Sequence, residues 1–138
     1  MIAYVDSSVV LRRILGQGSA LAEWRKIARP VASALVEVEC LRTLDRLRIR
    51  EGVSDRKISA WREAVFHLLA EAHVVEITSP VLQRASQPMP TTLGTLDAIH
   101  LATALLWKER GKSELVLATH DEALATAGRA SGLEIIGI

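Results

Sequence analysis

Aromatic residues are scarce in this chain: they make up 4% of its 138 residues, whereas hydrophobic residues make up 49%. The interior must therefore be filled mainly by Leu, Val, Ile and Ala, a composition that suits helices packed on a sheet. A chain of this length is in the usual range of one compact domain and buries a core without disulfides or a structural metal. We expect a single domain over residues 1–138.

Cysteine and long apolar runs are also nearly absent. Cys40 is the single cysteine, so an internal disulfide framework is excluded and a reducing compartment is indicated. The segment Met1–Asp6 has neither the basic opening nor the apolar stretch of a secretory signal. No segment reaches the roughly 20 apolar residues that span a bilayer. We therefore expect a cytoplasmic protein with no membrane contact.

Neither sign of charge is in large excess, because the formal net charge is +1. The basic residues are nevertheless unevenly distributed, and seven of them stand against three acids between Arg42 and Arg62. Such a stretch is either a solvated helical face or a surface that meets phosphate or an acidic protein. The sequence leaves both interpretations open.

Short apolar runs alternate with longer helical patterns along the chain. Strands are expected at Ile2–Val5, Pro30–Ser33, His73–Ile77, Leu115–Ala118 and Leu133–Ile136. Helices are expected at Val9–Leu15, Ser19–Ile27, Ala34–Arg50, from an N-cap at Ser54 through Ala72, after an N-cap at Ser79, at Thr95–Arg110 and at Asp121–Ala130, with a loop at Gln87–Gly94. This order predicts an α/β fold with a mostly parallel sheet of four to five strands flanked by helices.

Two acids follow strands of that predicted sheet. Asp6 comes directly after the first strand, and Asp121 comes three residues after the fourth strand ends. Ligand sites of parallel sheets lie at the carboxyl ends of the strands, so both acids are candidates for a site. Each also has a structural alternative: Asp6 as a helix cap, and Asp121 or a capping box of Thr119 with Glu122 at the last helix.

Asp97 stands at the start of a helix, Leu96–Trp107, that is apolar on nearly all sides and is therefore predicted to be buried. Its neighbours one and two turns on are Leu101 and Ala104, so its carboxylate should point inward or into a cleft. A buried charge costs on the order of several kcal/mol unless a partner compensates it. Favourable placement near a helix N-terminus offsets only about 0.3 to 1 kcal/mol. A cation, or chemistry that pairs this carboxylate with another group, is the better explanation.

Glu39 is not selected by periodicity. A helical projection places Glu39 beside Arg42, whereas Glu37 lies nearer the apolar side that carries Cys40. An ordinary surface ion pair between Glu39 and Arg42 explains the residue as well as a functional role does.

Taken in order, the four acids resemble those of the PIN-domain nucleases, and of VapC-type toxins of toxin–antitoxin systems in particular. The resemblance covers essentially the whole chain and rests on four segments: Tyr4-Val5-Asp6-Ser7-Ser8, Ser33-Ala34-Leu35-Val36-Glu37-Val38-Glu39, Thr95-Leu96-Asp97-Ala98-Ile99-His100-Leu101-Ala102 and Thr119-His120-Asp121. The second segment departs from the family pattern, which often has a Thr three residues before its Glu, because Val36 stands there.

The resemblance implies a metal-dependent endoribonuclease. It implies that the four acids gather into one catalytic metal pocket, and it selects Glu39 in the second segment, the four being Asp6, Glu39, Asp97 and Asp121. Carboxylates drawn together repel unless a cation lies between them, and all-oxygen ligands favour Mg²⁺, with Mn²⁺ as a substitute, over zinc. Asp6 and Asp97 are expected as direct ligands and Thr119 as a supporting group. A cognate antitoxin, an RNA substrate and a homodimer are the implied partners.

Two rival functions were weighed against this interpretation. A phosphatase with an aspartyl nucleophile at Asp6 would have an Asp-x-Asp pattern, but position 8 is Ser8. A non-catalytic RNA- or protein-binding module of the same fold stays open, because metal binding does not prove turnover.

The four histidines are scattered over the expected elements and receive no catalytic role, since a metal activates water without a histidine base.

Overall fold

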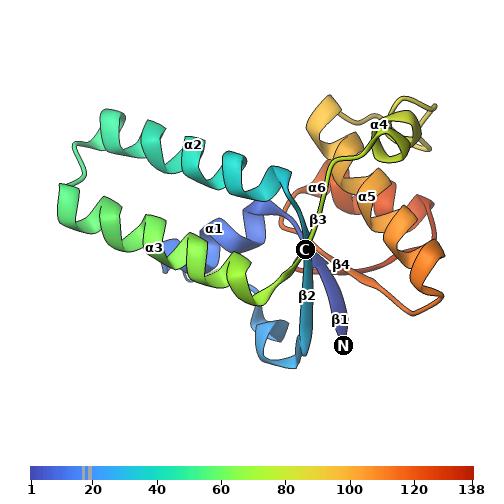
Figure 1. Ribbon diagram of the computed structural model, residues 1–138, viewed down its shortest axis with the longest axis horizontal. Coiled ribbons are helices and arrows are strands. Elements are labelled where there is room, and N and C mark those ends of the chain that lie inside the picture. The colour runs from blue at the N-terminus through green and yellow to red at the C-terminus, as the bar shows by residue number, and fades with distance from the viewer. Residues whose placement is uncertain (17, 19) are drawn as a thin grey trace.

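The computed structural model describes residues 1–16, 18 and 20–138 and has a three-layer α/β architecture (Figure 1). Its strands are β1 (Ile2–Val5), β2 (Arg29–Ser33), β3 (His73–Val75), β4 (Val116–Ala118) and β5 (Glu134–Ile136). They form one sheet in the order β3-β2-β1-β4-β5, and every neighbouring pair is parallel. The expected α/β fold is confirmed.

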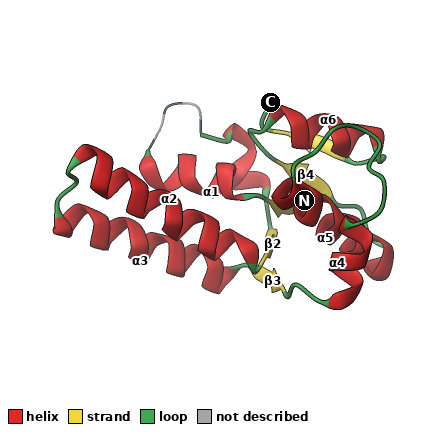
Figure 2. Ribbon diagram, turned by 90° about the horizontal axis from the view of Figure 1, so that it is seen from above, coloured by secondary structure: helices red, strands yellow, loops and turns green. Residues whose placement is uncertain are grey.

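Helices cover both faces of the sheet. They are α1 (Ser7–Leu15), α2 (Leu35–Glu51), α3 (Asp55–Glu71), α4 (Ser79–Ala85), α5 (Thr95–Gly111) and α6 (Glu122–Ala130), with a 3₁₀ turn η1 (Ala22–Lys26). Seen from above, α1, α2 and α3 lie on one side of the strands, and α4, α5 and α6 lie on the other (Figure 2). The long α2–α3 hairpin extends away from the sheet.

Two apolar clusters hold these layers together. One contains Val9, Cys40 and Leu44 beneath the α1–α3 layer, and the other contains Tyr4, Leu101 and Leu117 beneath α5 and α6. Aliphatic and small side chains dominate both clusters, as the low aromatic content predicts. In the part of the chain that is described, no helix is both long and apolar enough to cross a membrane.

Several expected boundaries need correction. The segment expected as a helix from Ser19 to Ile27 is only the 3₁₀ turn η1, and Ser19 itself lies outside the described residues. The N-cap of α4 is Thr78 rather than Ser79, and the Thr78 side chain makes no capping hydrogen bond. Ser79 is already helical because Pro80 occupies the first turn, where its missing N–H costs nothing.

Strand β3 ends at Val75, two residues before the predicted end at Ile77. It is an edge strand that pairs only with β2, whose last residue, Ser33, lies opposite Val75. With no further partner strand there, pairing stops. Strands β4 and β5 likewise begin one residue later than predicted, at Val116 and Glu134.

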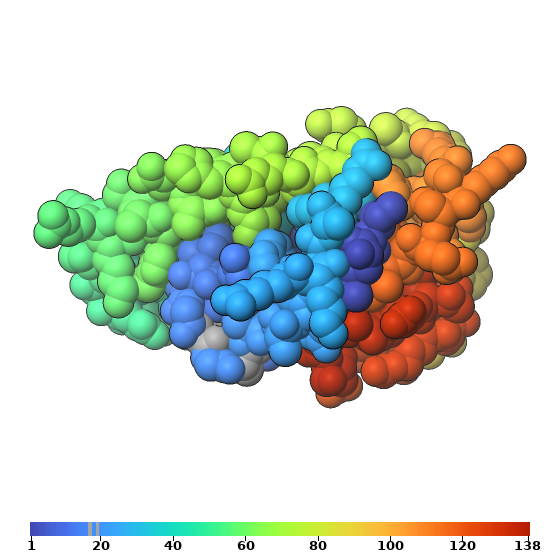
Figure 3. Space-filling model, turned by 90° about the horizontal axis from the view of Figure 1, so that it is seen from below, coloured from blue at the N-terminus to red at the C-terminus, as the bar shows by residue number. Residues whose placement is uncertain are grey.

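The orientation of the strands fixes where a site can form. In Figure 3, seen from below, the amino end of β1 (dark blue) lies between the η1–β2 segment (light blue) and the end of α5 (orange). The carboxyl ends of β1, β2 and β4 therefore lie at the opposite edge of the sheet, where α1, α2 and α6 begin. This edge is the one at which parallel sheets hold their ligands.

Candidate active site

Asp6 follows β1 and is 3% exposed. Its Oδ1 accepts hydrogen bonds from Ser8 Oγ (2.6 Å) and from the Val9 backbone N–H (3.2 Å), so it caps α1 as one interpretation of the sequence predicted. Its Oδ2 accepts from Thr119 Oγ1 (2.7 Å). These three donors fix the orientation of the carboxylate at the strand end.

Thr119 links the two strand ends that carry Asp6 and Asp121. Its hydroxyl is fully buried, donates to Asp6 and accepts from the Asp121 backbone N–H (3.0 Å). Asp121 Oδ1 accepts from Leu124 N (2.8 Å) and caps α6, so the cap is Asp121 and not the alternative box of Thr119 with Glu122. Thr119 therefore connects Asp6 to the backbone of Asp121, and its supporting role in the site stays a prediction.

The carboxyl-terminal residues of the chain contact the loop that carries Thr119 and Asp121. His120 Nδ1 lies 2.6 Å from the Gly137 carbonyl oxygen, and the His120 backbone N–H donates to Ser8 Oγ (2.9 Å). Gly137 has a φ of +100°, and a Cβ there would lie 2.5 Å from the Thr119 carbonyl oxygen. Glycine is therefore required where the chain passes behind Thr119.

Glu39 is held by a histidine that was assigned no role in the sequence analysis. Glu39 Oε1 lies 2.5 Å from His100 Nε2, and His100 Nδ1 lies 2.7 Å from the Tyr4 hydroxyl. Tyr4 and His100 are both buried, and burial, followed by the charges of Asp6 and Glu39, raises the pKa of the Tyr4 phenol well above its usual value. The phenol keeps its proton, and the two ring nitrogens of His100 connect the Tyr4 hydroxyl to the Glu39 carboxylate.

This chain of contacts resolves the ambiguity between the two glutamates of α2. Glu37 is exposed, contrary to the helical projection that placed it nearer the apolar side. The projection considers α2 alone, whereas Glu39 lies on the side of α2 that meets His100 of α5. The surface pair of Glu39 with Arg42 is also absent from the described contacts, in which Arg42 instead binds Asp45 (3.1 Å).

Asp97 lies in the first turn of α5 and is partly buried. Its pKa is raised, first by desolvation and then by the charge of Asp121, with further contributions from Asp6 and Glu39, while His100 acts in the opposite direction. Six buried residues of α5 confirm that this helix packs into the interior: Ala98, His100, Leu101, Ala102, Thr103 and Ala104. The four predicted acids are therefore close enough to act on one another electrostatically.

The donor set suits a hard divalent cation, since it consists of carboxylates whose mutual repulsion such an ion would relieve. Among the described residues, however, no three His, Cys, Asp or Glu side chains converge tightly enough to hold an ion in this conformation. Three of the acids instead satisfy their oxygens locally: Asp6 with Thr119, Glu39 with His100, and Asp121 with the backbone of α6. Side-chain rotation is needed before all four meet.

A signal for His100 was present in the sequence. It follows Asp97 by three residues on one helix, and residues at that spacing lie on the same face. What the sequence could not supply was its partner, because Glu39 is 61 residues away. His100 is a positioning residue by this geometry, since it reaches the site only through Glu39.

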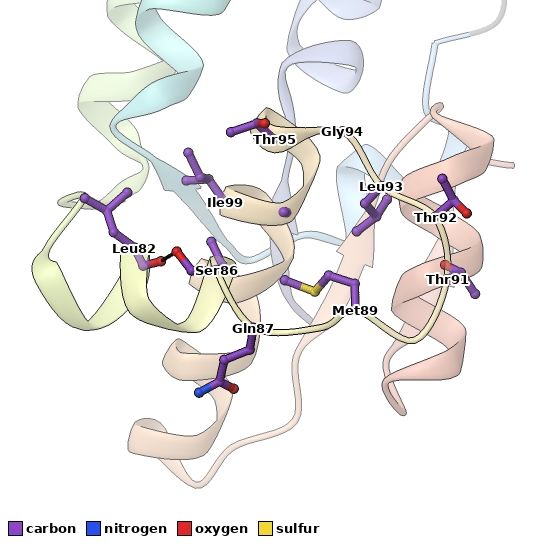
Figure 4. Close-up of a pocket in the computed structure, with 12 residues that line it drawn as sticks. Leu82, Ser86, Gln87, Met89, Thr91, Thr92, Leu93, Gly94, Thr95 and Ile99 are labelled. Carbon is purple, nitrogen blue, oxygen red and sulfur yellow. Dashed lines mark hydrogen bonds between the residues drawn. The ribbon is translucent and has the colours of Figure 1, made fainter.

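Two cavities border the amino-terminal turns of α5 on different sides. One of about 390 Å³ is lined by Glu39 and by Ser7 and Leu96, the neighbours of Asp6 and Asp97. The other, about 560 Å³, lies between α4, the loop 87–94 and the side of α5 that carries Thr95 and Ile99 (Figure 4). Thr95 and Asp97 are about 200° apart around the helix, so the second cavity is separate from the acids.

Residues 3–130 match the sequence profile described as PIN domain. The chain belongs to the PIN-domain family. Among PIN-domain relatives, "Ribonuclease VapC46" of Mycobacterium tuberculosis is 34% identical over 137 residues, covering 96% of this chain and 95% of the relative. "Ribonuclease VapC35" of the same species is 32% identical over 140 residues, covering 96% and 94%. The resemblance found in the sequence is confirmed.

Solved structures with the PIN fold lead to the same architecture. "Structure of FitAB bound to IR36 DNA fragment" has a TM-score of 0.73 at 16% identity, covering 99% of this chain and 94% of that one. "VapBC2 from Rickettsia felis bound to a DNA fragment from their promoter" has a TM-score of 0.67 at 11% identity, covering 98% and 97%. At such low identity these likenesses establish the fold only.

Proposed function

We propose that this PIN-domain protein is the toxin of a toxin–antitoxin pair and a Mg²⁺-dependent endoribonuclease, with Mn²⁺ as a substitute ion. The observation that carries the proposal is the placement of Asp6, Glu39, Asp97 and Asp121 around one edge of the sheet, in a chain 34% identical to a protein named a VapC ribonuclease. The whole chain, residues 1–138, is the nuclease domain. Its expected site of action is the cytoplasm.

In this proposal Asp6 and Asp97 bind the ion directly, and Glu39 and Asp121 complete its coordination, partly through water. When bound, the ion supplies an activated water for in-line attack on an RNA phosphodiester and stabilises the leaving oxygen. Thr119 orients Asp6 through its 2.7 Å hydrogen bond. His100 orients Glu39 in the same way from the opposite side of the site.

The proposed partners are a cognate antitoxin, an RNA substrate and a second copy of the chain. An antitoxin is supported by a structural neighbour titled "Toxin-antitoxin complex from Klebsiella pneumoniae", with a TM-score of 0.65 and 18% identity, covering 89% of this chain and 90% of that one. The homodimer and the RNA substrate rest on the family resemblance. A monomeric mass in light scattering at micromolar concentration would count against the dimer.

The proposal is tested by cleavage of total cellular RNA with Mg²⁺ and with EDTA. Asp6→Asn and Asp97→Asn should each lower the cleavage rate by more than about 100-fold, because direct ligands matter more than the supporting groups that cost about 10- to 100-fold. Glu39→Gln should also lose activity, whereas Glu37→Gln, which removes an exposed acid two residues earlier in α2, should retain it. Full activity of Asp6→Asn or Asp97→Asn, or equal loss in Glu37→Gln and Glu39→Gln, contradicts the assignment.

The alternative is a non-catalytic RNA- or protein-binding module that keeps the same acids. Calorimetric Mg²⁺ binding without cleavage of any cellular RNA would favour it. RNA sequencing of cleaved ends after controlled expression decides between the two, because only the nuclease produces new termini that disappear in Asp6→Asn.

A further inference from the structure

The cavity beside Glu39 continues from the acids along one face of α2. It is lined by Ser7, Glu39, Leu96, Arg42, Thr43 and Arg46, so residues next to or among three of the four acids form one end of it. Four other cavities are lined by none of the four acids. A nucleic-acid strand with one phosphate at the acids would therefore have its adjacent nucleotides next to this cavity.

Arg46 is the arginine in this cavity that has no carboxylate partner among the described ion pairs. Its guanidinium donates to Thr43 Oγ1 at 3.0 Å, which orients it without neutralising it. Arg42, by contrast, pairs with Asp45 (3.1 Å), a carboxylate that it shares with Arg48 (3.0 Å). Among the described ion pairs, Arg46 is thus the arginine of this cavity whose guanidinium is oriented but is not paired with a carboxylate.

The spacing along α2 suits a bound strand. Arg46 follows Glu39 by seven residues, two helical turns or about 10 Å along the axis, so both side chains project from the same face. Leu96 and Val38 border the cavity and are 49% and 50% exposed, which offers apolar surface for an unstacked base. Phosphate contacts by an arginine beside apolar surface are typical of single-stranded nucleic-acid grooves.

We propose that this cavity binds the RNA strand next to the scissile phosphate, with Arg46 on an adjacent backbone phosphate and Thr43 orienting Arg46. The inference rests on the proposed nuclease function, because it takes the acids as the place of the scissile phosphate. The volume of about 390 Å³ is large enough for part of one strand.

The test measures binding of a fluorescein-labelled single-stranded RNA by anisotropy over a range of KCl concentrations, with Asp97→Asn added to stop turnover. Arg46→Gln should weaken binding on the order of tenfold, as expected for loss of a charge-assisted hydrogen bond. It should also reduce the slope of log K against log salt by about 0.7, the contribution of one phosphate contact on a single strand. Thr43→Val should give a smaller loss in the same direction.

Arg48→Gln is the matched control, because it removes the same charge from the same helix about 200° around from Arg46. The Arg48→Gln variant should keep an RNA affinity and a slope of log K against log salt close to those of the parent. Equal effects of Arg46→Gln and Arg48→Gln, or no effect of Arg46→Gln, overturn the inference. Unchanged RNA affinity together with weakened binding of a protein partner by Arg46→Gln assigns the cavity to that partner and also overturns it.

The two proposals fail separately. If the otherwise unsubstituted protein cleaves no RNA with any divalent ion while Arg46→Gln still weakens binding, the nuclease assignment fails and the groove stands. If cleavage occurs and Arg46→Gln changes neither KM nor affinity, the groove fails and the nuclease stands. Thermal unfolding of each variant checks that the exposed substitutions leave the fold intact.

Discussion

His100 Nε2 lies 2.5 Å from Glu39 Oε1, and this contact fixes which glutamate of α2 faces the sheet edge. His100 is 1% exposed and is itself held by the buried Tyr4 hydroxyl at 2.7 Å. A core tyrosine thereby determines the orientation of a carboxylate at the surface of the site.

Tyr4→Phe tests that chain of contacts. The substitution leaves His100 Nδ1 buried without its hydrogen-bond partner, so the free energy of unfolding should fall by about 1 to 3 kcal/mol in urea denaturation. Because Glu39 loses its orientation, Mg²⁺ affinity by calorimetry should also fall. A stability loss with unchanged metal affinity would show that Tyr4 supports the core alone. Val31→Ala, another buried position in the same cluster, is the packing control and should lower stability without changing metal affinity.

Thr119→Val removes the hydroxyl that joins Asp6 to Asp121 while keeping the shape of the side chain. It leaves an Asp6 oxygen and the Asp121 N–H without this partner, so metal affinity and cleavage should each fall by about 10- to 100-fold. Thr119→Ser keeps the hydroxyl and should recover most of both. Equal defects in the two variants would mean that the methyl group, and not the hydrogen bonds, is what matters.

Asp97→Asn should stabilise the metal-free protein at neutral pH. The native pKa of Asp97 is raised, so the folded state holds this proton more tightly than the unfolded chain, and the associated stability is lost as pH rises through the native pKa. In EDTA, unfolding curves should therefore favour Asp97→Asn over the parent increasingly from acidic to neutral pH. Saturating Mg²⁺ should reverse the order.

Asp45→Asn should change stability at neutral pH in the direction opposite to Asp97→Asn. Hydrogen bonding by Arg48, followed by the charges of Arg48 and Arg42, lowers the pKa of Asp45, so its contribution is present at neutral pH and is lost on acidification through the native pKa. This variant should be less stable than the parent at neutral pH and similar at low pH. The same pH trend in Asp45→Asn and Asp97→Asn would contradict the origin given for both shifts.

Cys40 should be unreactive while the protein is folded. Its side chain is fully buried, and burial, with the charges of Glu39 and Asp6 adding to it, raises the pKa of the thiol to about 12. Thiol titration at pH 8 should proceed only at the rate of unfolding and should become fast in guanidinium chloride. Rapid modification of the native protein would show that α2 packs less closely than described.

The parallel α/β fold could be predicted because it depends on local pattern, and the four acids were selected by local pattern or by a family motif. Asp6 and Asp121 follow short apolar runs, and such runs end where a parallel sheet presents its ligands. The orientation of Glu39 could not be predicted from periodicity, since it depends on His100 from a distant helix. The 3₁₀ turn at Ala22–Lys26 was also missed, because helical periodicity does not separate one tight turn from a short α-helix.

Convergence of distant acids on one divalent ion is the central claim, and a crystal soaked in Mn²⁺ and measured at the manganese absorption edge tests it most directly. We predict an anomalous peak at the carboxyl ends of β1 and β4, with oxygens of Asp6 and Asp97 at roughly 2.0 to 2.2 Å, a typical range for small divalent ions on carboxylates. No peak at that edge, with the carboxylates of Asp6 and Asp97 pointing in different directions, would contradict the account.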